Sequence, residues 1–420
     1  LSSLVQSFEV LMGFKCAHFA DIHFRGLSRH EEYREVFSDI FKKISTMELD
    51  VIFIGGDIVH SKTQGISPEL IDVLSWWFTS MAEIAPTHVI LGNHDGLILN
   101  KDRQDAITPI IKALNNPNIF LYKKSGTYQT GIPGFNWCVF SCFDEEGWED
   151  VKPVEGEVNI ALFHGGVLGS KTDINWNIEG EVKASFFKDY DFALLGDIHK
   201  MQYLDGEKRI AYCGSTIQQN YGEDPGKGFL FWEIEDKDNF SSVFHEVHHD
   251  QPFVTIEWKG NVPDTMIGAR KHPDGARFRV KSENQINQTD IVHLHSELKH
   301  VKEASEIVYK YDVDFGETAL RTAEEGNVIK DLRSEKTLQT LMKEYYKGAV
   351  LKEDEWKTLE DLVSKHSQSA VFDNAVARNT KWSIKSMKFD NVFGYGKGNY
   401  INFETLPGIT GIFGKNRSGK

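Results

Sequence analysis

Five short polar motifs occur in the first half of the chain, and each directly follows an apolar run of strand length. In chain order they are Asp21-Ile-His23, Gly56-Asp57-Ile-Val-His60, Gly92-Asn93-His94-Asp95, Phe163-His164-Gly165 and Gly196-Asp197-Ile-His199. Imidazole nitrogens combined with carboxylate and carboxamide oxygens suit manganese, iron or zinc better than calcium or magnesium alone. The motifs therefore predict a site for two divalent metal ions. Asp57 is the candidate bridge, because one carboxylate can bind two cations held about 3.5–4 Å apart.

The segments between the motifs predict the fold that carries them. From residue 14 to residue 232, strand-length apolar runs alternate with segments of helical periodicity, such as 33–44 and 70–81. This alternation is typical of an α/β fold with a largely parallel sheet, where ligands bind at the carboxyl ends of the strands. All five motifs fall at such ends, so we expect their side chains to share one site.

Each motif taken alone has a simpler explanation. An isolated histidine beside a strand is more often a hydrogen-bonded structural residue than a ligand. Asp21 or Asp197 could cap a helix, and Gly92-Asn93 could form a turn. The coincidence of residue type and strand position in all five motifs favours the metal site.

The order DxH, GDxxH, GNHD, FHG and GDxH resembles the calcineurin-like metallophosphoesterases. Within them, Gly55 before the second motif and the run Tyr212-Cys-Gly-Ser-Thr-Ile-Gln-Gln-Asn220 are similar to the SbcD type of DNA-repair nuclease. The resemblance covers residues 14–260 and implies a layered sheet structure with flanking helices. It also implies two sets of metal ligands that share Asp57. Asp21, His23, Asp57 and His199 would hold one cation, and Asp57, Asn93, His164 and Asp197 the other.

The resemblance implies catalytic roles for three further residues. His94 would stabilise the transition state and help to protonate the leaving oxygen, with Asp95 orienting its ring. His60 would lie near the scissile phosphate.

The fifth motif departs from the family pattern, which usually reads GHxH where this chain has Gly196-Asp197-Ile-His199. An aspartate can still bind a divalent cation, but it lowers the net positive charge of the metal pair. Alternatively, Asp197 accepts a hydrogen bond from a ligand histidine.

The resemblance implies manganese-dependent hydrolysis of DNA, with 3′-to-5′ exonuclease and endonuclease action; magnesium, iron and zinc are alternative cations. Because the net charge is −15, DNA contacts would come from a local basic surface and from the metals. Two other classes stay open. One is a phosphoesterase acting on a small nucleotide or a phosphoprotein, and the other is a scaffold whose altered fifth motif has weakened catalysis.

Smaller regions are expected after residue 232. Residues 233–315 combine strand-like runs with a helical segment at 287–311, and they resemble the capping domain that helps to position DNA in SbcD-type nucleases. An ordinary α+β accessory domain is the alternative. Residues 316–370 carry two amphipathic helices. In the family such a pair binds the partner ATPase, and a self-contained helical hairpin is the alternative. The resemblance also implies a homodimer.

Residues 371–420 are interpreted as a linker and the start of an SbcC-type ATP-binding domain. A strand-like run leads into Gly414-Lys-Asn-Arg-Ser-Gly419-Lys420, a GxxxxGK phosphate-binding loop whose backbone N–H groups can cradle phosphates. Gly414, Asn416, Ser418, Gly419 and Lys420 are the candidate ATP contacts, although an ordinary turn is the alternative. The expected partner is thus an SbcC-type ATPase, in cis or in trans. No ATPase activity is expected from these 420 residues by themselves.

The remaining features concern the cellular environment. The four cysteines form no CxxC pair, which predicts a reduced, cytoplasmic protein. No run of eighteen or more apolar residues is present, so no membrane span is expected. Residues 1–13 are interpreted as an N-terminal extension that lacks the features of a signal peptide.

Overall fold

The computed structural model describes residues 13–60, 66–98, 100, 103–180, 182–311, 338–339, 342–343, 346, 352–372, 384–391 and 395–406. The predictions for the extension at 1–12 and for the phosphate-binding loop at 414–420 lie outside these residues. Contacts divide the chain into a first unit, Leu1–Phe253 with Ser386–Lys420, and a second unit, Val254–Lys385.

The first unit contains two six-stranded sheets within its described residues. One sheet has the order β12-β11-β1-β2-β3-β4, in which β1 to β4 are parallel and β11 and β12 are antiparallel. Its strands are β1 (Phe14–Phe19), β2 (Val51–Ile54), β3 (Thr87–Ile90), β4 (Ile119–Tyr122), β11 (Gly228–Ile234) and β12 (Phe240–Glu246).

The other sheet has the order β5-β6-β7-β8-β10-β9, in which β6, β7, β8 and β10 are parallel. Its strands are β5 (Gly126–Gln129), β6 (Phe135–Phe140), β7 (Val158–His164), β8 (Phe192–Gly196), β9 (Gln202–Tyr203) and β10 (Ile210–Tyr212). The prediction of a single, largely parallel sheet is therefore wrong, because the strands of the first unit form two such sheets. Periodicity identifies strands, but it does not say which strands pair.

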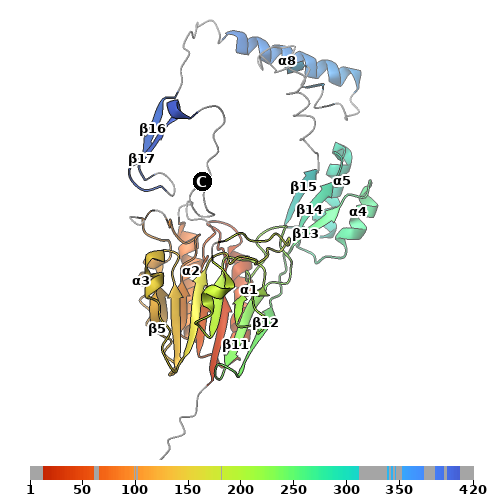
Figure 1. Cartoon of the computed structure of the whole chain (residues 1–420). Coiled ribbons are helices and arrows are strands. Elements are labelled where there is room, and N and C mark those ends of the chain that lie inside the picture. The colour runs from red at the N-terminus through yellow and green to blue at the C-terminus, as the bar shows by residue number, and fades with distance from the viewer. Residues whose placement is uncertain are drawn as a thin grey trace, which may run out of the picture. The chain divides into compact units, whose positions relative to one another are not determined.

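Three helices cover the outer face of the first sheet: α1 (His30–Ile44), α2 (Pro68–Ile84) and α3 (Thr108–Leu114) (Figure 1). Phe37 and Trp77 bury their rings against this sheet, 5.5 Å apart between ring centroids. A second core lies between the two sheets and includes Phe53 and Trp137, whose rings are 5.9 Å apart. The outer face of the second sheet is covered by loops and by the short helices η1 (Glu145–Asp150) and η2 (Ala184–Phe187). These layers confirm the predicted layered α/β fold.

The second unit begins later than predicted. Its boundary lies at Phe253, not at residue 232, because β12 pairs with β11 and completes the edge of the first sheet. The unit contains a three-stranded sheet, β13-β14-β15, packed with two helices around Phe278 and Leu294. Its elements are β13 (Phe253–Glu257), α4 (Val262–Ala269), β14 (Arg277–Ser282), α5 (Gln288–Val301) and β15 (Glu306–Tyr311).

The segment 287–311, predicted as helical throughout, is a helix followed by a strand. The helix α5 ends before Glu303, which has a left-handed φ of 49°. Residues 306–311 then alternate between exposed and half-buried side chains, the two-residue period of a strand. β15 pairs with β14 in parallel.

Four further elements are described, one of them the short helix η4 (Phe403–Thr405). The helix α8 (Glu353–Phe372) contains the second of the two helices predicted at 316–370, whereas most of the first lies outside the described residues. The strands β16 (Ser386–Phe389) and β17 (Asn399–Asn402) form an antiparallel pair.

All four cysteines are buried and none forms a disulfide. Within the described ranges, no helix combines the length and apolarity needed to cross a membrane.

Candidate metal centre

The five motifs meet at the carboxyl ends of strands from both sheets. Motifs that follow β1, β2 and β3 come from one sheet, and motifs that follow β7 and β8 come from the other. The structure brings together all seven predicted metal ligands, namely Asp21, His23, Asp57, Asn93, His164, Asp197 and His199. All seven belong to the first unit.

Asp57 lies between two groups of these side chains. Its Oδ1 is 3.3 Å from His164 Nε2, and its Oδ2 is 3.8 Å from His23 Nε2. The two carboxylate oxygens thus face different imidazoles. This is the arrangement that a bridging ligand requires.

The first group consists of Asp21, His23 and His199, whose ligand atoms all lie within 4.8 Å of one another. The Nε2 atoms of His23 and His199 are 2.9 Å apart. Two nitrogens bound at right angles to one cation, each at about 2.0–2.1 Å, would be separated by about the same distance. The residues therefore fit a divalent metal.

The second group consists of Asp57, Asn93, His164 and Asp197. The Nδ1 of His164 lies 2.7 Å from the carbonyl oxygen of Gly55, to which it can donate. That bond leaves Nε2 facing the carboxylates, as in metal-binding histidines held by a backbone carbonyl. Asp197 Oδ1 lies 3.6 Å from this nitrogen and accepts a 2.7 Å hydrogen bond from the Asn93 amide. Asp197 thus lies where a ligand of the second cation would be.

Four of the candidate ligands have a left-handed backbone. The φ angles are 53° at Asp21, 54° at His23, 53° at Asp57 and 100° at Asp197. Such conformations cost about 1–3 kcal/mol each and cluster at functional sites, where the surrounding structure enforces them. The strain falls on metal-ligand candidates in both groups, which a purely structural role for the motifs does not explain.

Glycines allow the two sheets to approach closely around the site. A Cβ on Gly92 would lie 2.2 Å from both the backbone nitrogen and Oδ1 of Asp57, and 2.6 Å from His164 Cε1. Gly92 is therefore required by the close approach of the second and third motifs.

Replacing Gly92 with alanine is expected to displace Asp57 and to weaken metal binding by about 10–100-fold, the range measured for changes behind the ligands. Calorimetric titration with Mn²⁺ measures this. The matched control is Gly206→Ala, because a Cβ on Gly206 meets no atom within 4 Å. Equal affinity in the two variants would contradict the packing described here.

Glu223 and Lys227 support the first group, and neither was predicted from the sequence. Glu223 Oε1 lies 2.8 Å from His199 Nδ1 and orients that ring. The buried Lys227 ammonium donates to the His199 carbonyl at 2.8 Å and to Asp173 at 3.1 Å. Both residues follow the last motif without a local pattern of their own.

The segment 212–220, which is similar to SbcD-type nucleases, stabilises the loop of the first motif. The side chain of Gln219 donates to the carbonyl of Ile22 at 3.1 Å, between Asp21 and His23. Its backbone N–H donates to Glu223 Oε2 at 2.9 Å. This segment therefore connects the Asp21-Ile-His23 loop to the carboxylate behind His199.

His94 lies beside both metal groups. Its backbone N–H donates to Asp57 Oδ1 at 2.7 Å, and its ring centroid is 4.9 Å from that of His23. His94 Nδ1 lies 2.6 Å from the carbonyl oxygen of His60. The predicted contact between Asp95 and the His94 ring is wrong, because this carbonyl orients the ring instead.

Asp95 is fully buried and holds the backbone of the second and third motifs together. Its carboxylate accepts hydrogen bonds from the N–H groups of Ile58, Val59 and Gly92, at 2.8–3.0 Å. The imidazole of His60 contacts Arg25, with 2.9 Å between Nε2 and Nη1. Burial and the Arg25 guanidinium lower the pKa of His60 to about 4, so Arg25 carries the positive charge of this pair next to His94.

Proximity and burial shift the protonation of the site. Burial opposes charge on His164, but the Asp57 carboxylate outweighs it and raises the pKa of His164 to about 10. Burial likewise opposes charge on His199, but its hydrogen bond to the Glu223 carboxylate raises its pKa to about 9. Burial also favours the neutral form of Asp57, yet His164 and His23 hold its pKa well below the usual range.

Metal binding is therefore expected to release protons. Ligand histidines must be neutral, so near pH 8 the binding of both cations displaces about two protons, one from His199 in the first group and one from His164 in the second. Affinity should rise with pH and level off above the pKa values of both rings. Calorimetric titration with Mn²⁺ in two buffers of different ionisation enthalpy counts the protons. A heat of binding that is the same in both buffers would contradict this account.

Comparisons with known proteins agree with this geometry. Residues 14–201 match the family model described as calcineurin-like phosphoesterase. The chain is 34% identical over 431 residues to the uncharacterized protein R555 of Acanthamoeba polyphaga mimivirus, a match covering 96% of this chain and 31% of that protein. It is 25% identical over 204 residues to protein 244L of Invertebrate iridescent virus 6, covering 46% of this chain and 66% of that protein.

A bacterial relative is also similar. The chain is 21% identical over 247 residues to SbcD, one of the subunits of the nuclease SbcCD of Escherichia coli strain K12, covering 49% of this chain and 61% of that protein. The chain thus spans less than two thirds of the length of each of these three relatives.

Proposed function

Because residues 14–201 form a calcineurin-like metallophosphoesterase domain, we propose that the chain is a manganese-dependent nuclease that hydrolyses DNA phosphodiester bonds, with exonuclease and endonuclease action. One observation carries the proposal: six metal-ligand candidates converge around a seventh, Asp57, and His94 lies directly beside them. When bound, two divalent cations would supply Lewis acidity and a nucleophile generated from water at neutral pH.

The residues of the chain position the reacting groups. The His60 carbonyl holds Nδ1 of His94, so Nε2 is the nitrogen that can face a substrate. His94 donates a proton from Nε2 to the oxygen that leaves phosphorus. The bond from the His94 N–H to Asp57 keeps this ring next to the bridging carboxylate.

Two observations support DNA as the substrate. The bacterial relative belongs to a nuclease, and its similarity extends over 49% of this chain. In addition, Arg25 places a local positive charge at the site, in contact with His60, although the whole chain has a net charge of −15. Arginine beside the reacting centre can bind the phosphate backbone.

Partners are proposed by analogy with the same relative, whose name makes it one part of a multi-subunit nuclease. We propose an SbcC-type ATPase as the partner, in cis through residues 371–420 or in trans, and a homodimer of the nuclease.

End-labelled single-stranded and duplex oligonucleotides, incubated with Mn²⁺ or with EDTA, test the proposed function. Mn²⁺-dependent shortening of DNA, faster than hydrolysis of p-nitrophenyl phosphate, is the expected result. Hydrolysis of small phosphate esters with intact DNA would favour the small-substrate phosphoesterase. No hydrolysis of any substrate by metal-loaded protein would favour a scaffold.

A further inference from the structure

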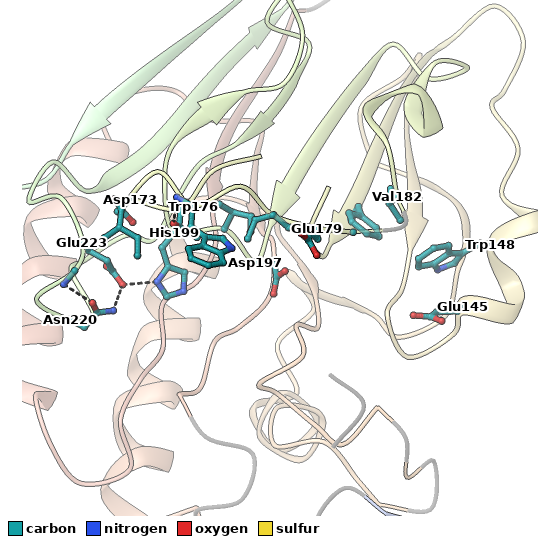
Figure 2. A pocket seen from close by; sticks show the side chains of 18 residues that line it. Glu145, Trp148, Asp173, Trp176, Glu179, Val182, Asp197, His199, Asn220 and Glu223 are labelled. Carbon is teal, nitrogen blue, oxygen red and sulfur yellow. Dashed lines mark hydrogen bonds and ion pairs between the residues drawn. The ribbon is translucent and has the colours of Figure 1, made fainter. Parts of the chain in front are cut away.

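A cavity of about 760 Å³ opens beside the metal centre. Asp197 and His199 line it, so the cavity is continuous with both groups of candidate ligands. Its volume lies within the range of about 300–1,000 Å³ that is usual for sites that bind small organic groups. Figure 2 shows Trp176 beside His199, Trp148 with Glu145 at the opposite side, and Asp197 between them.

The two tryptophans give the cavity aromatic walls. Trp148 is fixed: its Nε1 donates to the Ser141 carbonyl at 3.0 Å, and its ring meets Phe163 edge-on at 5.6 Å between centroids. Trp176 is 70% exposed, and its neighbour Ile174 is 69% exposed. Because the Trp176 side chain is so exposed at the edge of the cavity, it does not contribute to the hydrophobic core. It offers a free aromatic face to a ligand.

The loop that carries Trp176 is tied to the metal centre. The backbone N–H of Thr172 donates to the Trp176 carbonyl at 3.0 Å, which closes the loop. Asp173, in the same loop, accepts from Lys227, and Lys227 also donates to the carbonyl of His199. The loop that carries the aromatic ring is thereby connected to a candidate metal ligand.

The charge of the cavity limits what can enter it. Five carboxylates line it, and no lysine or arginine does so among the residues that the structure describes. The carboxylates belong to Glu145, Asp173, Glu179, Asp197 and Glu223. Lys227 offsets two of them, Asp173 and Glu223. The lining therefore disfavours a further phosphate, whereas a neutral aromatic ring with amino donors can stack on tryptophan and donate to Glu145 or Glu179.

We propose that Trp176 and Trp148 form a subsite for one unpaired nucleobase adjacent to the scissile phosphate. The proposal rests on the proposed function and specifies its substrate. The sugar-phosphate backbone lies against the Arg25 guanidinium, and the base lies in the acidic, aromatic cavity. A paired base cannot enter, so single strands and frayed ends are better substrates than the interior of a duplex.

The test combines a protein change with a substrate change. Cleavage is measured on a single-stranded oligonucleotide and on the same strand with one abasic tetrahydrofuran residue, at the phosphodiester beside it. In the parent protein, loss of the base should raise KM about 5- to 150-fold, which corresponds to the free energy of stacking one base. This rise in KM is called the abasic penalty. In Trp176→Ala the KM for the normal strand should rise by a similar factor, and the abasic penalty should disappear. Trp176→Phe should keep the penalty.

The control variant is Phe120→Ala, which removes a 41% exposed aromatic ring from β4, outside the cavity lining, and should keep the full abasic penalty. An equal abasic penalty in the parent and in Trp176→Ala would overturn the subsite, even if DNA cleavage is intact. A mononucleotide phosphodiester distinguishes the source of the base. If Trp176→Ala raises KM for that ester while no DNA is cut, the subsite stands and the proposed DNA substrate fails.

Discussion

Replacing Asp57 with asparagine is expected to abolish both the binding of two metals and the hydrolysis of DNA. A carboxamide has one oxygen acceptor, so it cannot present an oxygen to each of the two groups that Asp57 now faces at 3.3 and 3.8 Å. The loss of activity should exceed the 10–100-fold that changes behind metal ligands cost. Mass-spectrometric metal counting and oligonucleotide cleavage measure the two effects.

The backbone should tolerate this change, because asparagine adopts the left-handed conformation of Asp57 as readily as aspartate does. Asp238→Asn, on an exposed bend, is the matched control and should keep metal and activity. Retention of two metals and full activity in Asp57→Asn would show that this carboxylate is not the bridge.

Replacing His94 with glutamine is expected to lower kcat by about 10²–10⁴-fold, the contribution typical of a general acid, without loss of metal. The reason is that His94 donates a proton and holds no cation in the proposed mechanism. Steady-state cleavage kinetics and metal counting on the same sample separate the two properties. His248→Gln, whose ring is exposed and distant from the motifs in the sequence, serves as the control.

The metal count is the decisive part of that experiment. Ligand atoms of His23, Asp57 and His94 lie within 4.8 Å of one another, so His94 is close enough to bind a cation itself. If His94→Gln loses one metal together with its activity, His94 is a ligand. DNA degradation at the parental rate in His94→Gln would contradict its catalytic role altogether.

Much of the site could be predicted from the sequence, because its chemistry is local. Asp21 and Asp57 lie two and three residues after a buried strand, and His164 is the last residue of one; parallel strands bring their carboxyl ends to one edge. That reasoning holds although the strands divide between two sheets, because the two layers are packed with these ends together. Pairing between strands depends on long-range contacts, which periodicity does not reveal.

The sequence does not predict the roles of residues that hold a neighbouring group of the site in position. Glu223 reaches His199 by way of a loop that has no motif, so no spacing could identify it. The family resemblance implies that Asp95 orients the His94 ring. In the fold its carboxylate turns to the N–H groups of Ile58, Val59 and Gly92, which would otherwise be buried without a partner.

At the fifth motif the structure bears on a question that the sequence left open, namely the role of Asp197. Asp197 stands where the family pattern has histidine, and it lies 3.6 Å from His164 with a strained φ of 100°. Its backbone N–H donates to both oxygens of Asp21 at 3.1 Å, which joins the two metal groups through the fifth motif. A position so constrained supports a ligand role for the carboxylate.

An anomalous-difference map from crystals grown with Mn²⁺ tests the central claim most directly. The account predicts two peaks about 3.5–4 Å apart, one beside Asp21, His23 and His199 and the other beside Asn93, His164 and Asp197, with the Asp57 carboxylate touching both. A single peak, or two peaks that Asp57 does not join, would contradict it.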